Sequence, residues 1–221
     1  MNALIRDNIE ATKNLVCWSE KVQVKRIIYM SSVAVYGNVD GELCEESAIQ
    51  NPSIYGITKH LGESIIKESE IPEKLILQLP KMIGPYVHLE DTRDSGFLTM
   101  TKKILNDEKV ICFIPEMYYN NYLHVAELSV FLQTLLQQAV WDEKKTVLVA
   151  AQERLTMMKI LQIMKETAES RSEIIAQSNG TMPNVSLINV SKAKELGFSP
   201  CAAEDMLRRF ISEVKVPSVS K

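Results

Sequence analysis

The chain has 221 residues, of which 46% are hydrophobic and 24% charged, so it is long enough to bury one large core or two small ones. Its net charge of −3 provides no basic field for a nucleic-acid partner. No apolar run reaches the roughly 18 residues that a membrane span needs. The N-terminus lacks a hydrophobic signal core, and the four cysteines have no metal-like spacing. We therefore expect a cytoplasmic protein with reduced, mostly buried thiols and no metal site.

Helical and strand-like patterns alternate along the chain. Helices are expected over residues 7–20, 54–69, 95–107, 125–140, 157–170, 191–196 and 204–214, and strands over 24–31, 74–79, 110–114, 146–150 and near 185–190. Ser53 is expected to cap the second of these helices. In the first helix, Ile9, Leu15 and Val16 are expected on the apolar side, with Trp18 as a further candidate. This alternation predicts an α/β fold, in which helices cover a parallel sheet.

The most informative feature is Tyr55 with Lys59, which follows a strand that ends in Ser31-Ser32. Side chains four residues apart lie on one face of a helix, so the phenol and the ammonium can point into the same pocket. A phenol with a pKa near 10 becomes a usable acid or base at neutral pH only beside positive charge. Together with the Ser32 hydroxyl, the pair predicts a site that moves a proton on or off a substrate hydroxyl. The alternative is an exposed helix with a half-buried tyrosine and a solvated lysine.

The strand, the Ser31-Ser32 pair and the helix with Tyr55 and Lys59 follow one another in this order. In this respect the sequence resembles the extended short-chain dehydrogenase/reductases, the family of NAD-dependent nucleotide-sugar epimerases and dehydratases. Ser32 falls where that family has its catalytic Ser or Thr, and Tyr55 and Lys59 fall on its Tyr-x-x-x-Lys pair. Further matches follow in the family's order: Asn8-Ile9-Glu10-Ala11-Thr12-Lys13-Asn14-Leu15, Gly84-Pro85, Leu123-His124-Val125 and Leu196-Gly197-Phe198-Ser199-Pro200.

The resemblance implies a partial Rossmann-like, doubly wound parallel sheet that contains only the later strands, and a smaller α/β substrate-side domain. Residues 1–84 and 122–151 would form the second half of the cofactor domain, and residues 85–121 and 152–221 the substrate-binding domain. The strand that ends at Ser31-Ser32 would then expose an edge.

The resemblance also implies roles for particular residues, with NAD or NADP as the cofactor. It assigns catalysis to Ser32, Tyr55 and Lys59, cofactor contacts to Tyr55, Lys59, Pro80 and Met82, and substrate contacts to Ser32, Val33, Lys81 and Asn120. In this scheme, Tyr55 moves the proton while the cofactor takes or returns hydride. Lys81 is expected either to meet a phosphate or to lie solvated in a loop. His124 is expected to be a core or helix-start histidine.

Three departures from the family's pattern narrow the expected function. The eight glycines form no Gly-x-x-Gly-x-x-Gly turn, which in the family holds the cofactor pyrophosphate. Val33-Ala34 stand where the family's dehydratases have an Asp-Glu pair, so epimerase or reductase chemistry is favoured over dehydration. Asn120 stands where the family has an Arg that clamps a diphosphate.

We therefore expect an NAD(P)-dependent sugar-nucleotide epimerase or reductase whose activity needs a glycine-rich N-terminal half outside these 221 residues. One alternative is an inactive homologue that binds a partner chain, and another is a reductase of a non-nucleotide carbonyl compound. The expected partners are a small molecule, with a nucleotide sugar as a candidate, and a second polypeptide, through homodimerisation or through the exposed edge of the sheet. Nucleic acid and membrane are not expected.

Overall fold

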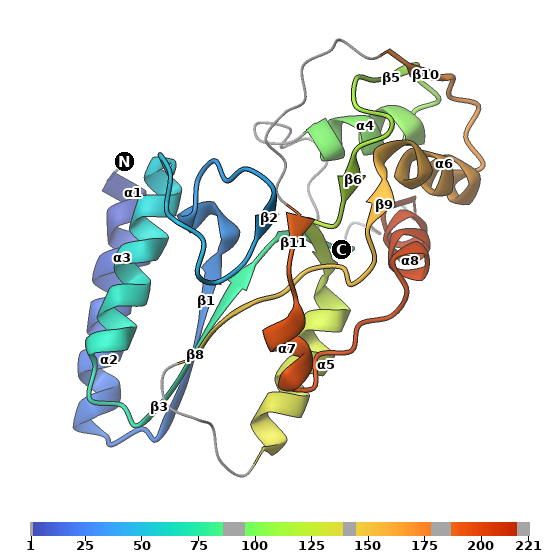
Figure 1. The fold of residues 1–221 in the computed structure, drawn as a ribbon. Helices are drawn as coiled ribbons and strands as arrows, with labels where there is room; N and C mark the ends of the chain where they lie inside the picture. Colours follow the sequence, from blue (N-terminus) through green and yellow to red (C-terminus); the bar gives the residue numbers. More distant parts are fainter. Residues whose placement is uncertain (1, 86–95, 139–144, 178–186, 216–221) are drawn as a thin grey trace, which may run out of the picture. The chain divides into compact units, whose positions relative to one another are not determined.

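A computed structural model describes residues 2–85, 96–138, 145–177 and 187–215 (Figure 1). The chain divides into two compact units. Unit 1 consists of Met1–Pro80, Phe131–Ala150 and Asn184–Phe198, and unit 2 of Lys81–Val130, Ala151–Pro183 and Ser199–Lys221. These bounds differ from the expected domains at residues 81–84, 122–130, 151 and 184–198, and the assignment of the two domains to cofactor and substrate stays a prediction.

The sheet of unit 1 is parallel, as the alternating pattern predicts. It contains β1 (Arg26–Ser32), β3 (Glu73–Leu79) and β8 (Lys145–Leu148) in the order β1-β3-β8, with Arg26 opposite Glu73 and Leu75 opposite Lys145. The central strand β3 is buried almost throughout, which is typical of parallel strands covered on both faces. The α/β fold class is thus confirmed, and β1 is an edge strand of this sheet in the described part of the chain.

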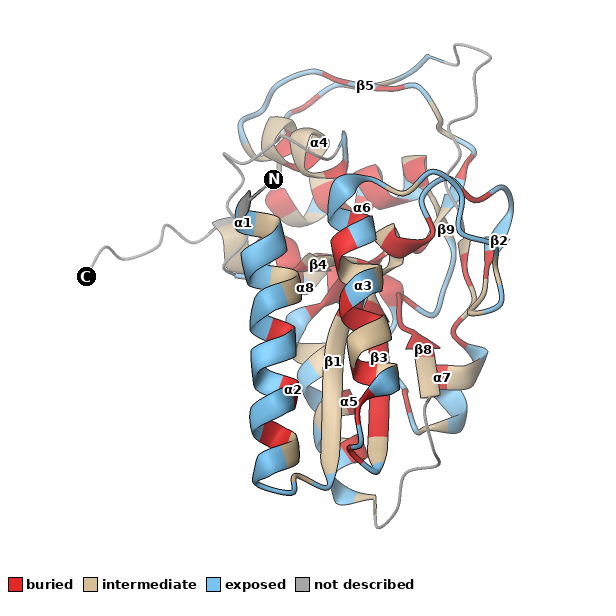
Figure 2. Ribbon diagram, turned by 90° about the vertical axis from the view of Figure 1, so that its left-hand side faces the viewer, coloured by how far each residue is buried: buried red, intermediate tan, exposed pale blue. Residues whose placement is uncertain are grey.

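Two parallel helices cover one face of this sheet: α2 (Ala11–Lys21) and α3 (Ile54–Glu68) (Figure 2). The chain enters α2 through the short α1 (Asn2–Ile5) and a π-helical turn, Arg6–Glu10. The Ser53 hydroxyl caps α3 by accepting the Gly56 N–H, as the sequence predicts. The core beneath these helices is formed by Val16, Ile66, Ile76, Ile27, Tyr29 and Ile65.

Leu15, which was expected on the apolar side of the first helix, and Trp18, a further candidate for that side, are not buried. Val16 is buried, but Leu15 is 52% and Trp18 57% exposed. The buried residues of α2 are Thr12, Val16 and Ser19, so the face toward the sheet is centred on Val16. Leu15 and Trp18 lie about 100° around the helix from Val16 and Ser19, and no described element of unit 1 covers them fully.

The remaining elements of unit 1 are short. A 3₁₀ turn at Val33–Val35 follows β1, and the short strand β2 (Glu42–Leu43) pairs in parallel with β11 (Leu187–Ile188). The second half of α5 (Val125–Gln137) and α7 (Ser191–Glu195) complete the unit, and Phe131 of α5 packs edge-on against Phe198.

The described residues of unit 2 form three complete helices, the first part of α5 and three pairs of short strands. The helices are α4 (Gly96–Leu105), α6 (Met157–Ala168) and α8 (Ala203–Lys215), and α6 packs on both of the others. The pairs are β4 (Lys81–Ile83) with β7 (Tyr122–His124), β5 (Val110–Cys112) with β10 (Ile174–Ala176), and β6 (Tyr118–Tyr119) with β9 (Leu155–Thr156). Of these six strands, only β5 is expected from the sequence, as part of an apolar run over residues 110–114. The others are too short to show a recognisable periodicity.

The four cysteines are free thiols, but only Cys112 is buried and Cys17 is exposed, so the expectation of mostly buried thiols is wrong. Within the described ranges, no helix combines the length and apolar character that crossing a bilayer requires. The same ranges contain no group of acidic, histidine and cysteine side chains suited to a metal ion.

Candidate functional site

The structure brings the turn that carries Tyr55 and Lys59 to the end of β1, where Ser32 lies. Ser32 is the last residue of β1, and its Oγ accepts the Ala34 N–H at 3.2 Å, which opens the 3₁₀ turn. Gly56 allows α3 to approach this turn closely, because a Cβ on Gly56 would lie 2.1 Å from the Ala34 carbonyl oxygen. The helix that follows Tyr55 is therefore fixed against the backbone two residues beyond Ser32.

Lys59 fixes the same helix to the residue two positions before Ser32. Its Nζ donates to the Met30 carbonyl at 2.5 Å and lies 4.5 Å from the centre of the Tyr29 ring. Burial lowers the pKa of Lys59, while the nearby Glu63 carboxylate acts in the opposite direction. Tyr55 itself is 41% exposed. The observed contacts of Lys59 are thus with β1, and its expected effect on the pKa of Tyr55 stays a prediction.

Asn8 also contacts this region, although the sequence indicates it only as part of a family motif. It lies in the π-helical turn, and its Nδ2 donates to Thr58 Oγ1 at 3.0 Å. The Thr58 hydroxyl in turn donates to the Tyr55 carbonyl at 2.9 Å. Single π turns often occur at functional sites, but they leave no signal in helical periodicity. Asn8 therefore holds the turn between Tyr55 and Lys59 from the side of α2.

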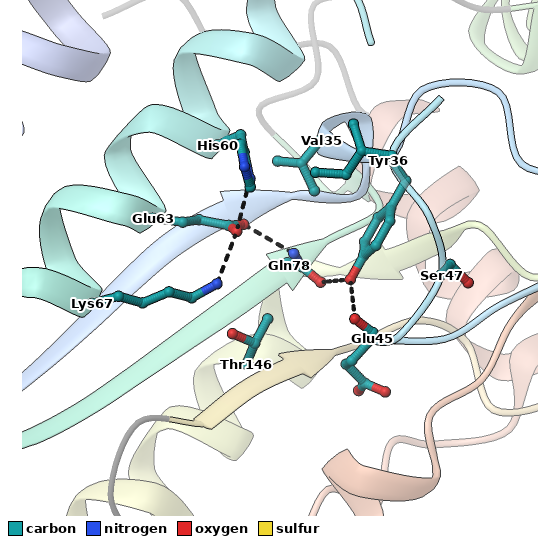
Figure 3. A pocket seen from close by; sticks show the side chains of 10 residues that line it. Val35, Tyr36, Glu45, Ser47, His60, Glu63, Lys67, Gln78 and Thr146 are labelled. Atoms are coloured by element: carbon teal, nitrogen blue, oxygen red, sulfur yellow. Dashed lines mark hydrogen bonds and ion pairs between the residues drawn. The ribbon is translucent and has the colours of Figure 1, made fainter. Parts of the chain in front are cut away.

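A buried carboxylate, Glu63, lies one turn after Lys59. Figure 3 shows it pointing toward His60, Lys67 and Gln78 of β3. Its Oε1 accepts the Ser31 hydroxyl at 2.5 Å and the Gln78 amide at 3.0 Å. His60 Nδ1 and Lys67 Nζ lie 3.7 and 3.8 Å from its Oε2. Because Ser31 is the neighbour of Ser32, this network fixes the end of the strand that carries the candidate catalytic hydroxyl.

The network continues into a cavity of about 120 Å³. The Tyr36 hydroxyl donates to Gln78 Oε1 at 2.8 Å, with the Glu45 carbonyl 3.2 Å away (Figure 3). Burial raises the pKa of Tyr36, so this phenol remains a hydrogen-bond donor throughout the physiological range. The sequence signal for Glu63 was available: an acidic residue four positions after Lys59, on the buried face of the helix.

The other predicted site residues are divided between the units. Val33 and Pro80 belong to unit 1, and Pro80 is buried directly after β3. Lys81 and Met82 lie in β4 of unit 2, both partly exposed. Asn120, also in unit 2, is 1% exposed and donates to the Ala151 carbonyl at 3.0 Å. The roles of these residues in cofactor or substrate binding stay predictions.

His124 lies at the start of α5, as predicted, and is buried. Its Nδ1 accepts the Ala126 N–H at 3.2 Å, so the proton is on Nε2, which lies 2.8 Å from Glu213 Oε2. Burial alone would raise the pKa of Glu213, but hydrogen bonds from Arg209 and His124 outweigh it, and the pKa is lowered. His124 thus joins α5 to α8 within unit 2.

Comparison with known proteins identifies the class. A sequence profile of the NAD dependent epimerase/dehydratase family matches residues 1–151, and the chain belongs to this family. A curated relative, an uncharacterized UDP-glucose epimerase, YtcB of Bacillus subtilis, is 21% identical over 193 residues, which are 86% of this chain and 60% of that protein.

Two solved structures have a similar fold at 20% sequence identity. One is UDP-N-acetylglucosamine 4-epimerase from Methanobrevibacter ruminantium, in complex with UDP-N-acetylmuramic acid, with a TM-score of 0.77 over 95% of this chain and 69% of that one. The other is UDP-glucuronic acid 4-epimerase from Bacillus cereus in complex with NAD, also with a TM-score of 0.77, over 96% of this chain and 68% of that one. The present chain therefore has a Rossmann-like epimerase fold, but spans only part of the length of its relatives.

The residues present fit the reactive end of a nicotinamide cofactor better than its pyrophosphate. Ser32, Tyr55 and Lys59 offer two hydroxyls and an ammonium around one helix turn and strand end. None of the eight glycines contributes to a glycine-rich phosphate turn, and Gly56 and Gly62 are used instead for close packing of α3. These 221 residues thus contain the hydroxyls and the ammonium expected at the reactive end of the cofactor, and lack the glycine-rich sequence expected at its pyrophosphate.

Proposed function

We propose that this chain is the proton-transfer part of an NAD(P)-dependent epimerase or reductase that acts on a sugar nucleotide. Tyr55 exchanges a proton with a substrate hydroxyl, Ser32 hydrogen-bonds the reacting oxygen, and Lys59 holds the cofactor ribose and favours the phenolate. The cofactor supplies the hydride transfer when it is bound. The activity requires a glycine-rich segment, which these 221 residues do not contain.

The observation that carries this proposal is that α3 contacts the backbone both before and after Ser32. Gly56 packs on Ala34 and Lys59 bonds to Met30, so the first two turns of α3 lie along the end of β1 on both sides of Ser32. A helix that was merely exposed would have no reason to be fixed in this way. Membership of the NAD dependent epimerase/dehydratase family supports the same interpretation.

The decisive experiment supplies the missing segment. We would fuse the part of the Bacillus cereus UDP-glucuronic acid 4-epimerase that this chain does not match to residue 1, and measure NAD binding by calorimetry and epimerisation of UDP-sugars. We expect binding by the fusion and none by the 221 residues alone. Tyr55→Phe should lower the rate of the fusion about 10²- to 10⁴-fold. A fusion whose turnover is unchanged by Tyr55→Phe would exclude the proposed proton transfer.

The substrate has a second candidate, a carbonyl compound without a nucleotide. Asn120 is uncharged, almost fully buried and bonded to the Ala151 carbonyl, so it supports no bidentate clamp on a diphosphate. If this candidate is right, the fusion should reduce simple carbonyl compounds with NADH or NADPH, and UDP should not inhibit it. Inhibition by UDP would favour the sugar nucleotide.

A non-catalytic role in binding a partner chain is the third candidate, because β1 pairs with β3 alone among the described strands. Homodimerisation and pairing of the other edge of β1 with another polypeptide are both consistent with it. In this case the 221 residues would bind a second chain whether or not they bind NAD.

A further inference from the structure

A chain of buried hydrogen bonds in unit 1 ends at one side chain, Glu63 (Figure 3). Ser31 Oγ and Gln78 Nε2 donate to its Oε1 at 2.5 and 3.0 Å, and Tyr36 Oη donates to Gln78 Oε1 at 2.8 Å. The carboxylate determines these directions. Because an ionised carboxylate only accepts, Gln78 has to turn its N–H toward Glu63 and its oxygen toward Tyr36.

The two outer members of this chain bracket the short segment that contains Ser32. Ser31 directly precedes Ser32 in β1, and Tyr36 follows the 3₁₀ turn that begins after it. Both are buried, whereas residues 32–34 between them are partly exposed. Ser31 is also opposite Gln78 in the ladder between β1 and β3. Glu63 therefore holds both ends of the exposed segment, and one rung of the sheet, through a single oxygen atom.

Glu63 lies on the same helix as Tyr55 and Lys59, at successive intervals of four residues. Each interval of four advances by about 40° around a helix, so the three side chains form a stripe that turns slowly. The stripe passes from Tyr55, which is 41% exposed, to Glu63, which is 1% exposed. The buried end of the stripe is thus bonded to the segment around Ser32, and the exposed end carries the candidate acid or base.

We propose that Glu63 is a positioning residue of the candidate site, which holds residues 31–36 against α3 and so fixes the Ser32 hydroxyl relative to Tyr55. This inference rests on the proposed function, because it gives Glu63 a part in the reaction assigned to Ser32 and Tyr55. Glu63 acts through Ser31 and needs no contact with the reacting atoms. A displacement of about 1 Å in a positioned group can lower a rate by about 10²-fold.

The role depends on the place of the acceptor oxygen and not on the charge of Glu63. Its second oxygen, Oε2, faces His60 and Lys67 at 3.7 and 3.8 Å. A glutamine at this position keeps an oxygen in the place of Oε1. Its amide nitrogen would meet His60 Nδ1, which is buried and has no hydrogen-bond partner in the described part of the chain. An aspartate keeps the charge but withdraws both oxygens by one methylene group.

Hydrogen exchange of one backbone amide, measured by NMR on the 221 residues, tests the placement. The Ala34 N–H donates to Ser32 Oγ at 3.2 Å, so its protection reports the position of that hydroxyl. We expect Glu63→Met and Glu63→Asp to speed its exchange about tenfold, and Glu63→Gln to change it less than about twofold. The Gly56 N–H is the matched control, since it donates to Ser53 Oγ, also at 3.2 Å, on the same helix, and its exchange should not change.

Ser31→Ala breaks the same bond from the side of the strand. It leaves the Gln78 amide on the carboxylate, so it disturbs the core less than Glu63→Met does. Ala34 should again exchange severalfold faster. In the double variant, Glu63→Met should have a smaller effect than it has alone, because both substitutions remove one shared bond.

The fusion protein described above tests the consequence for the reaction. We expect Glu63→Met to lower kcat about tenfold and to change KM for the UDP-sugar less than about twofold, because Ser32 bonds the oxygen that reacts. Glu63→Gln should recover most of the rate that Glu63→Met loses, and Glu63→Asp should not. Glu68→Gln, at an exposed position of the same helix, should leave both constants unchanged.

The proposal is overturned if Glu63→Met leaves the exchange of Ala34 unchanged, or speeds Ala34 and Gly56 equally, or if Glu63→Gln is as impaired as Glu63→Met. An unchanged kcat for Glu63→Met, in a fusion whose rate depends on Tyr55, would overturn the positioning role and leave the proposed proton transfer intact. If Tyr55→Phe has no effect on the rate, the proton transfer fails instead, and the exchange of Ala34 still decides whether Glu63 places the Ser32 hydroxyl.

Discussion

The two edges of β1 have opposite characters. Toward β3, the strand has a complete parallel ladder, and its end is held by the buried contact of Ser31 with Glu63. Toward the outside it has no second strand in the described part of the chain, and the Met30 carbonyl is bonded by a lysine side chain instead. The ladder with β3 determines where Ser32 lies, and the described contact on the other side is made by a side chain of α3. The same seven-residue strand thus combines a regular ladder with a single side-chain bond.

The largest effect on the inner side is expected from Glu63→Ala. Removing the carboxylate leaves the Ser31 hydroxyl and the Gln78 amide buried without their acceptor, which should cost about 3 kcal/mol of unfolding free energy. Urea unfolding followed by circular dichroism measures this loss. Glu68→Ala, at an exposed position of the same helix, should change stability by less than about 0.5 kcal/mol. Equal effects of the two variants would contradict a special role for the buried carboxylate.

Gly56→Ala tests the close packing of α3 on the turn after Ser32. The new Cβ would lie 2.1 Å from the Ala34 carbonyl oxygen, a backbone atom that cannot rotate away. We expect a loss of about 2 kcal/mol, even though alanine favours a helix by up to about 1 kcal/mol relative to glycine. Gly96→Ala is the control, because a Cβ there meets nothing within 4 Å. A stabilised Gly56→Ala protein would show that the close approach of α3 is not required.

The two flanks of α2 should respond differently to truncation. Val16 is 5% exposed and part of the core, so Val16→Ala should cost about 1–2 kcal/mol. Trp18 is 57% exposed, and Trp18→Ala should change stability by less than about 0.5 kcal/mol in a dilute, monomeric sample. Thermal unfolding at low and high protein concentration measures both effects. A loss for Trp18→Ala as large as that for Val16→Ala would contradict this difference between the two flanks.

The sequence predicted those features that a local pattern specifies. The apolar run of β1, the cap at Ser53 and the spacing of Tyr55 and Lys59 all depend on near neighbours, and β1 and α3 were predicted to within two residues. It did not predict the short strands of unit 2 or the π turn at Asn8, because neither has a periodicity that can be recognised.

The exposure and the direction of side chains near the candidate site are harder to predict from the sequence. The apolar spacing of Leu15 and Trp18 indicates a helix face, but it does not tell which element covers that face. The spacing of Tyr55 and Lys59 places both on one side of α3, yet a lysine has a long flexible chain, and its ammonium reaches Met30. The exposure of Leu15 and Trp18 therefore differs from the expectation, whereas the expected effect of Lys59 on Tyr55 stays a prediction.

The smallest expected effect is a pH dependence that originates at this outer edge. Burial lowers the pKa of Lys59 below the ordinary 10.5, with Glu63 opposing, so the unfolded chain holds this proton more tightly than the folded one. Stability should therefore rise with pH between the folded and unfolded pKa values of Lys59, and the rise should be missing in Lys59→Met. Burial also raises the pKa of Tyr29, which removes stability above its ordinary value of 10.0, so the comparison is best made below that pH. Urea unfolding of both proteins between neutral pH and that limit tests the prediction, and parallel curves would show that the buried ammonium is not the group responsible.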